Sequence, residues 1–310
     1  MRGDDLHQST DSDGHAPGPV TLALGVIGAG RVGNALARLL AARGWPIVAV
    51  TSRTPEHAHE LADAVGADYV PEAASVLARA DLTLLTVPDD AITACAEDWV
   101  DAAVPGHAVV HTSGVHGAEA LAPLARRGMR VGSLHPAFPF AGGETPVLAG
   151  VFFAIESDDL QLRRDLLNLV AALGGVPLLI PAGGKATYHA ALAIASNYAV
   201  TLYAEAERML MGLGIPRETA DGALNGLLEG TVANLIERGI PGALTGPLSR
   251  ADVGTVRRHL LTLEATDPEL AALYAALARR TLPLVRARGL DTGPLQRLLE
   301  EESAYAPDGS

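Results

Sequence analysis

Lys185 is the only lysine among the 23 lysine and arginine residues of the chain, and it begins the segment KATYHAALAIASNY. A partly buried lysine has a lowered pKa and can donate a proton near neutral pH, which arginine cannot do. At about 100° per residue, a helix places Lys185, His189, Leu192 and Ser196 on one face, with Asn197 roughly a quarter-turn round. The segment therefore predicts a catalytic stripe with Lys185 as the acid, His189 as its partner or an alternative acid, and Ser196 and Asn197 orienting substrate. The alternative is an exposed first-turn lysine beside a plain packing face.

A glycine-rich turn gives a second candidate site, for a dinucleotide. The segment GVIGAGRVGNAL has G-x-G-x-x-G spacing, follows an apolar run and opens a helical pattern. Such a turn lets the backbone approach a pyrophosphate, whose charge the helix N-terminus stabilises. The predicted cofactor-binding residues of this turn are Gly28, Ala29, Gly30, Arg31, Val32 and Gly33. The alternative is a glycine turn kept for packing alone.

The end of the next apolar run favours NADP(H) over NAD. An NAD site usually has Asp or Glu about 20 residues beyond the glycines, to bind the ribose 2′-hydroxyl. Here the sequence reads Thr51-Ser52-Arg53-Thr54 and has no carboxylate. A hydroxyl and a guanidinium suit a 2′-phosphate, so Ser52 and Arg53 are predicted to bind it. If Arg53 is an ordinary surface arginine, the preference stays open.

Three further segments follow apolar runs and should reach the same crevice, because ligands of open parallel sheets bind at the carboxyl ends of the strands. TVPDDAI places Val87, Pro88 and Asp89 beside the cofactor. HTSG places Ser113 near the nicotinamide end of the cofactor, where its side chain would also orient the substrate. SLHPAFPF places His135 within reach of substrate. The alternative is that Pro88 and Gly114 in these segments only terminate strands.

The elements that must position these residues fall into two groups. Short apolar runs separated by helical patterns predict strands at 22–28, 46–52, 68–70, 81–88, 107–114, 129–136, 150–156 and 176–181. After residue 183 only helical patterns follow, at 185–213, 217–238, 252–264, 267–288 and 293–302. The fold class is thus α/β, with an N-terminal Rossmann doubly wound parallel sheet followed by an all-helical C-terminal domain. The predicted domains are a disordered tail over 1–20, a Rossmann NADP-binding domain over 21–182, and a helical substrate and dimerisation domain over 183–310.

Composition excludes several classes of function. The chain has 310 residues, enough for two cores, and a net charge of −13, which argues against nucleic acid or an anionic membrane as the main partner. Its single cysteine, Cys95, rules out an internal disulfide framework and multi-cysteine zinc sites, and we find no metal-binding spacing. The polar start has no apolar core typical of a signal peptide, so we expect a cytoplasmic protein.

These motifs together resemble a family of bacterial Rossmann-like oxidoreductases whose helical C-terminal domain is of unknown function. The resemblance rests on GVIGAGRVG, TVPDDAI, HTSG, SLHP, KATYHAALAIASNY and ALTGPLSRADVGTVRRHL, and it covers about residues 22 to 290. In the last segment Thr245, Gly246, Pro247, Arg250 and Asp252 look like a loop that related enzymes bring to the active site. Related folds are pyrroline-5-carboxylate reductase, the 3-hydroxyacid dehydrogenases and the ketopantoate reductases. Family members often have polar residues where SLHPAFPF continues with Ala137, Phe138 and Pro139.

The resemblance implies an NADP-dependent reductase acting on the carbonyl of a small 2-oxo acid in a cleft between the domains, with ketopantoate as a candidate. Arg250, His135 and Asn197 would then bind the substrate, Lys185 or Arg250 its carboxylate. A homodimer formed through the C-terminal helices is also implied. Two alternatives stay open: imine reduction of the pyrroline-5-carboxylate type, and a non-catalytic NADP-binding sensor.

Overall fold

The computed structural model describes residues 22–140 and 146–303 and divides the chain into two compact units, Met1–Ala199 and Val200–Ser310. The predicted tail over 1–20 lies outside the described residues. The division falls after the predicted boundary at residue 182, because the helix that begins at Lys185 buries this residue in the first unit.

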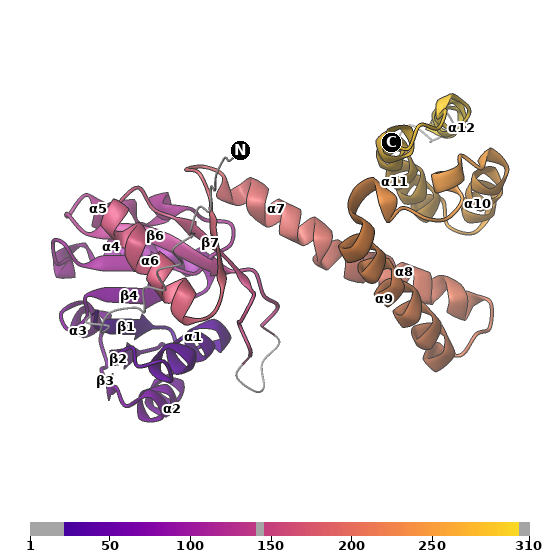
Figure 1. Cartoon of the computed structure of the whole chain (residues 1–310). Helices are drawn as coiled ribbons and strands as arrows, with labels where there is room; N and C mark the ends of the chain where they lie inside the picture. Colours follow the sequence, from indigo (N-terminus) through magenta and orange to yellow (C-terminus); the bar gives the residue numbers. More distant parts are fainter. Residues whose placement is uncertain (1–21, 141–145, 304–310) are drawn as a thin grey trace, which may run out of the picture. The chain divides into compact units, whose positions relative to one another are not determined.

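The first unit is built on one sheet, with helices on both faces (Figure 1). In the part of the chain that is described, eight strands lie in the order β3-β2-β1-β4-β5-β6-β7-β8. Their bounds are β1 Leu24–Ile27, β2 Ile47–Thr51, β3 Asp68–Tyr69, β4 Leu82–Leu85, β5 Ala108–His111, β6 Arg130–Pro136, β7 Phe152–Glu156 and β8 Val176–Leu179. Strands β1 to β6 are parallel, and β7 runs antiparallel to β6 and parallel to β8. The predicted Rossmann-like, mostly parallel sheet is thus confirmed, and its topological switch point lies between β1 and β4.

Helices cover this sheet because its strands are apolar on both faces, as in β4, where all four residues are buried. One core joins the sheet to α1, α2 and α6, and the other joins it to α3, α4 and α5. These helices are α1 Arg31–Ala41, α2 Pro55–Val65, α3 Ala73–Leu77, α4 Ile92–Asp98, α5 Ala122–Ala125 and α6 Leu160–Ala172. Short 3₁₀ helices lie at Asp89–Ala91 (η1), Val100–Ala102 (η2) and Ala118–Leu121 (η3). The unit ends with α7, Lys185–Ala195.

The strand register aligns one row of residues near the carboxyl ends of the parallel strands. Leu85 of β4 pairs with His111 of β5, His111 with Ser133 of β6, and Ser133 with Glu156 of β7. Register partners project to the same face of a sheet. The row therefore changes from apolar to polar as it crosses from β4 to β7, and all four residues are buried.

The second unit is helical and has its own core. Its elements are the greater part of α8 Asn197–Gly212, then α9 Arg217–Gly242, η4 Leu248–Arg250, α10 Val253–Thr266, α11 Pro268–Ala287 and α12 Gly293–Ser303. The core lies among α10, α11 and α12. The predicted helix over 185–213 is two helices, since the chain leaves regular helix geometry at Ser196 (φ −115°, ψ −66°). The helix predicted over 217–238 loses helical geometry at Gly239, where φ is 60°.

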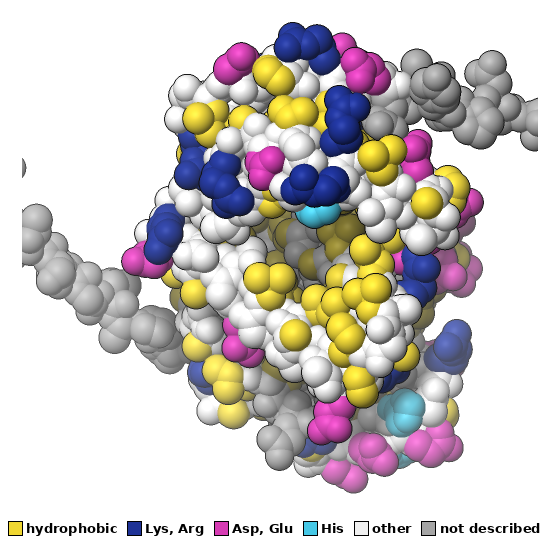
Figure 2. Space-filling view, turned by 90° about the vertical axis from the view of Figure 1, so that its right-hand side faces the viewer, with side chains coloured by type: hydrophobic (Ala, Val, Ile, Leu, Met, Phe, Trp, Pro, Cys, Tyr) yellow, Lys and Arg dark blue, Asp and Glu magenta, His cyan; other side chains and the backbone are white. Residues whose placement is uncertain are grey.

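Large apolar side chains are exposed along α8 and α9. No residue of α8 is buried, and Ala220 is the buried residue of α9. Figure 2 shows hydrophobic side chains gathered around a hollow on the face in view. Among the described residues, no helix has both the length and the hydropathy that crossing a bilayer requires.

Candidate functional site

The glycine-rich turn between β1 and α1 has the geometry of an anion-binding turn. Gly28 has a φ of +106°, which favours glycine, and Gly30 is the N-cap of α1. No side chain caps this helix start, and no acidic residue lies in its first turn. A Cβ on Gly30 would meet no atom within 4 Å, whereas one on Gly33 would clash with the Gly28 carbonyl and the Thr86 hydroxyl. The turn therefore leaves open space at Gly30 and packs tightly at Gly33, as a dinucleotide-binding turn requires.

Thr86 is a contributor to this turn that the sequence analysis did not single out. Its hydroxyl donates to the carbonyl oxygen of Gly28 at 2.5 Å, with the carbonyl of Ile27 at 3.3 Å. Thr86 comes directly after β4 and thus ties the end of this strand to the glycine turn. Only its place at the start of TVPDDAI could have indicated this contact.

A pocket of about 560 Å³ opens beside the turn at the carboxyl ends of β1, β2 and β4. It contains six of the predicted cofactor residues: Gly28, Gly30, Ser52, Arg53, Val87 and Pro88. His57, Cys95 and Trp99 also line it. Arg53 is exposed, so its guanidinium is available to a ligand. These features fit a dinucleotide whose pyrophosphate lies on the turn and whose ribose lies beside β2.

A second pocket, of about 240 Å³, contains two of the residues predicted to lie near substrate, His135 and His189. It is lined by Val32, Asp89, Thr112, Gly114, His135, Pro136, Phe138, Phe140 and His189. Val32 belongs to the first turn of α1, so this pocket adjoins the same helix start. Phe138 and Phe140 meet edge to face at 5.2 Å between ring centroids and give the pocket an apolar wall. Both belong to the segment SLHPAFPF.

Two imidazoles lie against the backbone of Gly114 in this pocket. A Cβ built on Gly114 would be 2.5 Å from Cδ2 of His189 and 2.9 Å from Nε2 of His135. The two rings are themselves edge to face, with centroids 6.2 Å apart. A glycine is therefore needed at this position, and the structure brings the predicted His135 and His189 together.

His135 is held neutral and is oriented by a tyrosine. Burial, and after it the positive charge of Lys185 and the neighbouring His189, lower the pKa of His135 to about 4, against the opposing effect of Asp89. Nδ1 of His135 lies 2.9 Å from the hydroxyl of Tyr188. Burial raises the pKa of this phenol to about 12. Both groups are uncharged at neutral pH.

Lys185 lies in the interior of the first unit and does not line either pocket. Its side chain is 1% exposed, and its Nζ has no hydrogen-bond partner among the described residues. Burial lowers the pKa of Lys185 to about 8, while the carboxylates of Glu156, Asp89 and Glu119 oppose this shift. The ammonium also lies 5.6 Å from the centre of the Tyr188 ring. The structure thus places the only lysine of the chain in the interior, near Asp89 and His135, which line the pocket.

The polar row across β5, β6 and β7 leaves further polar atoms without partners. Within the described chain, neither Ser133 Oγ nor Glu156 Oε2 makes a hydrogen bond, although both are buried. Burial raises the pKa of Glu156, Glu119 raises it further, and Lys185 together with a backbone hydrogen bond from Ala118 lowers it. Glu156 was missed from the sequence because a glutamate that ends a predicted strand carries no signal of burial.

Ser113 and its neighbour His111 hold the loop after β5. The Ser113 hydroxyl oxygen accepts the backbone N–H groups of Val115 and His116, at 3.2 and 3.1 Å. His111 Nε2 lies 2.9 Å from the Gly117 carbonyl, and its Nδ1 accepts the backbone N–H of Ser113. Burial and Lys185 lower the pKa of His111 to about 4. Ser113 is buried and lines neither pocket, so its predicted contact with cofactor and substrate stays a prediction.

The structure does not bring every predicted residue to this site. Ser196 caps the far end of α7, about 16 Å along the helix from Lys185, and Asn197 begins α8. Both are exposed and line neither pocket of the first unit. Arg250 ends η4 in the second unit. Their assignments to substrate stay predictions, as do those of Ala29 and Arg31 to the cofactor.

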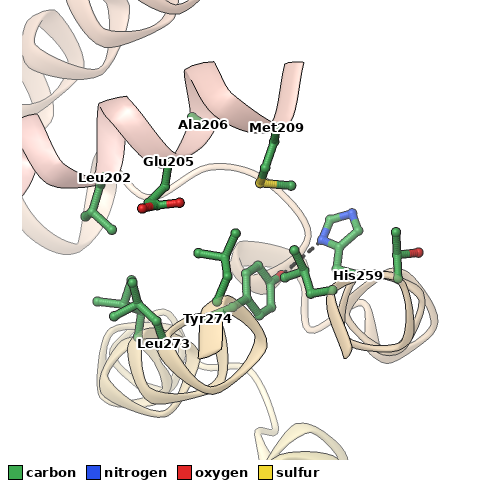
Figure 3. A pocket seen from close by; sticks show the side chains of 11 residues that line it. Leu202, Glu205, Ala206, Met209, His259, Leu273 and Tyr274 are labelled. Atoms are coloured by element: carbon green, nitrogen blue, oxygen red, sulfur yellow. Dashed lines mark hydrogen bonds between the residues drawn. The ribbon is translucent and has the colours of Figure 1, made fainter. Parts of the chain in front are cut away.

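The helical unit has a pocket of its own, of about 360 Å³. In Figure 3, Leu202, Glu205, Ala206 and Met209 of α8 face His259 of α10 and Leu273 and Tyr274 of α11. The lining is mostly apolar, and the Tyr274 hydroxyl lies 3.0 Å from Nδ1 of His259. This groove lacks the phosphate-binding features of the first unit.

Comparison with known families divides the chain into two matches. Residues 8–136 match a family described as a Rossmann-like domain, and residues 151–281 match one described as a domain of unknown function (DUF2520). No curated protein matches the sequence.

Solved structures share the fold over most of the chain. A "putative NADP oxidoreductase" from Bacteroides fragilis is 26% identical, with a TM-score of 0.65 over 84% of this chain and 97% of its own. A protein from Thermotoga maritima is 22% identical, with a TM-score of 0.72 over 86% of this chain and 100% of its own. A pyrroline-5-carboxylate reductase from Coxiella burnetii is 18% identical, with a TM-score of 0.55 over 85% and 98%.

Proposed function

Because the chain combines a Rossmann-like domain with a DUF2520 domain, we propose that it is an NADP(H)-dependent oxidoreductase that reduces the carbonyl group of a small substrate. Small 2-oxo acids, ketopantoate among them, are the substrate class to test first. The observation that carries this proposal is the pocket in which two imidazoles, from His135 and His189, adjoin the first turn of α1. A hydride acceptor in this pocket would lie next to the nicotinamide end of a dinucleotide bound at the glycine turn.

The preference for NADP(H) is supported by the end of β2. Ser52 and Arg53 line the larger pocket, and neither Asp nor Glu lines it to bind a ribose 2′-hydroxyl. Arg53 can bind a 2′-phosphate through two parallel charge-assisted hydrogen bonds. The similar protein from Bacteroides fragilis is described as a "putative NADP oxidoreductase".

A bound NADPH would supply the hydride, and the residues around the pocket would have to support the proton that the carbonyl oxygen gains. His135 and His189 supply nitrogen atoms at the pocket wall for hydrogen bonding to that oxygen. Lys185 does not line the pocket, so we assign it an electrostatic role: its buried positive charge would stabilise the negative charge that develops on the oxygen. A pKa of about 8 also lets it supply the proton through an intervening group.

Imine reduction is the second candidate, and the charge of the pocket favours it. Asp89 is the charged residue among those described as lining the pocket, which suits a cationic iminium better than a carboxylate. The structurally similar Coxiella burnetii protein is a pyrroline-5-carboxylate reductase. An iminium already carries its proton, so this reaction requires no strong acid.

The deciding experiment follows NADPH oxidation by the purified protein across 2-oxo acids including ketopantoate, matched ketones without a carboxylate, and cyclic imines. Lys185→Ala is run beside it. Turnover of a carbonyl substrate that collapses in the variant while NADPH still binds supports carbonyl reduction. Turnover of imines alone, little changed in the variant, supports the second candidate. Tight NADPH binding without any turnover overturns both and favours a non-catalytic NADP-binding sensor.

We also propose a homodimer formed through the helical unit. The large aliphatic side chains and methionines that are more than a third exposed between residues 200 and 287 are Val200, Leu202, Met209, Met211, Leu213, Leu227, Leu228, Val232, Leu235, Ile236, Ile240, Leu261, Leu273 and Leu277. Covering them would bury on the order of 800 Å² of apolar surface, at about 100 Å² for a fully exposed side chain of this size. Stable interfaces bury about this area on each partner, whereas the largest apolar patch of a typical monomer is smaller. A second copy is therefore the proposed occupant of this surface and of the groove in Figure 3.

A further inference from the structure

We propose that Tyr188 is a positioning residue that fixes the tautomer of His135, so that the pocket receives an Nε2–H donor. The inference rests on the proposed function and deepens it. A substrate that meets this donor must place a hydrogen-bond acceptor, such as a carbonyl oxygen or a neutral imine nitrogen, at the atom next to the carbon that is reduced.

The geometry links the two side chains directly. The Tyr188 hydroxyl lies 2.9 Å from Nδ1 of His135, and the rings meet edge to face at 5.7 Å between centroids. The opposite nitrogen, Nε2, is the one that lies near the Cα of Gly114 at the pocket wall. One ring nitrogen of His135 is thus engaged by Tyr188, and the other lies beside Gly114, which also lines the pocket.

In the proposed arrangement the phenol donates the proton of this hydrogen bond. His135 is neutral, so one of its nitrogens carries a hydrogen and the other is an acceptor. The phenol keeps its proton at neutral pH, and it is a good donor to an imidazole nitrogen. If Tyr188 donates to Nδ1, the ring hydrogen must be on Nε2.

The charged surroundings support the neutral form. The ionisable groups that act on His135 are Lys185, His189 and Asp89, and the first two disfavour its protonation. Lys185 also lies over the face of the Tyr188 ring, with its Nζ 5.6 Å from the centroid. A neutral imidazole N–H is a weak acid, so His135 would polarise the acceptor and stabilise developing charge rather than lose its proton outright.

The first test reads the tautomer without any substrate. In ¹⁵N-histidine-labelled full-length protein, the His135 resonances, identified by their absence in His135→Gln, should show a protonated Nε2 and an unprotonated Nδ1. Tyr188→Phe should move His135 towards a mixture of tautomers. A protonated Nδ1 in the wild type, or an unchanged tautomer in Tyr188→Phe, overturns the proposal.

The second test uses turnover of a carbonyl substrate. Tyr188→Phe should lower kcat on the order of tenfold, because one neutral hydrogen bond is lost, and should leave the Kd for NADPH unchanged. Gln at position 135 offers an N–H donor that needs no tautomer, so adding Tyr188→Phe to His135→Gln should have no further effect. An equal loss in both backgrounds would contradict the positioning role. If no substrate is turned over but the tautomer shifts as expected, the proposed function fails and the role of Tyr188 stands.

Discussion

Lys185 and Glu156 are both buried in the first unit and act electrostatically on each other, and each has a polar atom without a hydrogen bond to the described residues. Their effects on each other's pKa have opposite sign: Glu156 raises the pKa of Lys185, and Lys185 lowers that of Glu156. Burial dominates for both groups and disfavours both charges. Charging either group in the folded protein therefore costs stability, as expected where a charge serves function.

Replacing Lys185 should change how stability depends on pH. The folded-state pKa of Lys185 is about 8, below its ordinary 10.5, so the unfolded state binds this proton more readily than the folded state does. The stability associated with the neutral lysine is therefore fully present above pH 10.5 and is lost as the pH falls through 8. In Lys185→Met, the rise in the free energy of unfolding between pH 8 and 10.5, on the order of 3 kcal/mol for this group, should disappear. Urea denaturation of both proteins across this range measures it.

The double variant Lys185→Met with Glu156→Gln is the control. The single variant Lys185→Met removes the positive charge near Glu156. Because the pKa of Glu156 is raised in the folded state, this variant should lose stability as the pH rises above the ordinary glutamate value of 4.5. The double variant should lack this loss. An unchanged slope above pH 8 in Lys185→Met would contradict the buried position of the lysine.

Gly30→Ala should weaken cofactor binding and leave the fold intact. Gly30 has ordinary extended backbone angles, and an added methyl meets no protein atom within 4 Å. The methyl would instead occupy the space where we expect the pyrophosphate, so the Kd for NADPH should rise at least tenfold. Fluorescence titration measures the Kd, and thermal unfolding should shift by only a few degrees. Gly33→Ala, which clashes with Gly28 and Thr86, should destabilise the fold by about 1–3 kcal/mol.

Arg53→Ala should reduce the preference for NADPH over NADH. Loss of the charge-assisted contacts to a 2′-phosphate should raise the Kd for NADPH about tenfold and leave that for NADH unchanged. Arg43→Ala, another exposed arginine but one that lines neither pocket, is the matched control. Equal weakening of both cofactors in Arg53→Ala would show that this residue does not select the phosphate.

Gly114→Ala should disturb catalysis more than cofactor binding. Its methyl would lie 2.5 Å from His189 and 2.9 Å from His135, so both rings must move away from their places in the pocket. Displacements of this size lower turnover by on the order of tenfold to a hundredfold. Steady-state kinetics with the best substrate of the panel measure the effect. Gly226→Ala, in open space on α9, should leave turnover unchanged, and normal kcat in Gly114→Ala would remove the imidazoles from the reaction.

Much of the larger pocket, beside the glycine-rich turn, could be predicted from the sequence because its signals are local. The spacing of Gly28, Gly30 and Gly33 and the missing carboxylate near Arg53 are visible within single strand–turn–helix segments. The smaller pocket, lined by His135 and His189, depends on contacts between segments that are distant in the sequence. Tyr188 acts on His135 across 53 positions, and nothing in the sequence around either residue shows this hydrogen bond.

The direction of strand β7 explains why the sequence did not indicate Glu156 as a site residue. The apolar run at 150–156 predicts a strand but not its direction, and β7 is antiparallel to β6. This direction pairs the last residue of β7, Glu156, with Ser133 beside His111. Helical periodicity predicts that Ser196 shares a face with Lys185. It does not show that Ser196 lies at the far end of the helix, away from the sheet.

The proposed homodimer predicts that a charge on α9 will separate the subunits. Ile236 is 82% exposed in the single chain, and burying a glutamate there against apolar side chains costs several kcal/mol. Light scattering after gel filtration should give twice the 32.0 kDa chain mass for the wild type and the single mass for Ile236→Glu. Val147→Glu, at an equally exposed apolar residue of the first unit, should stay dimeric. A wild-type monomer at tens of micromolar would leave the apolar surface of α8 and α9 to a different partner.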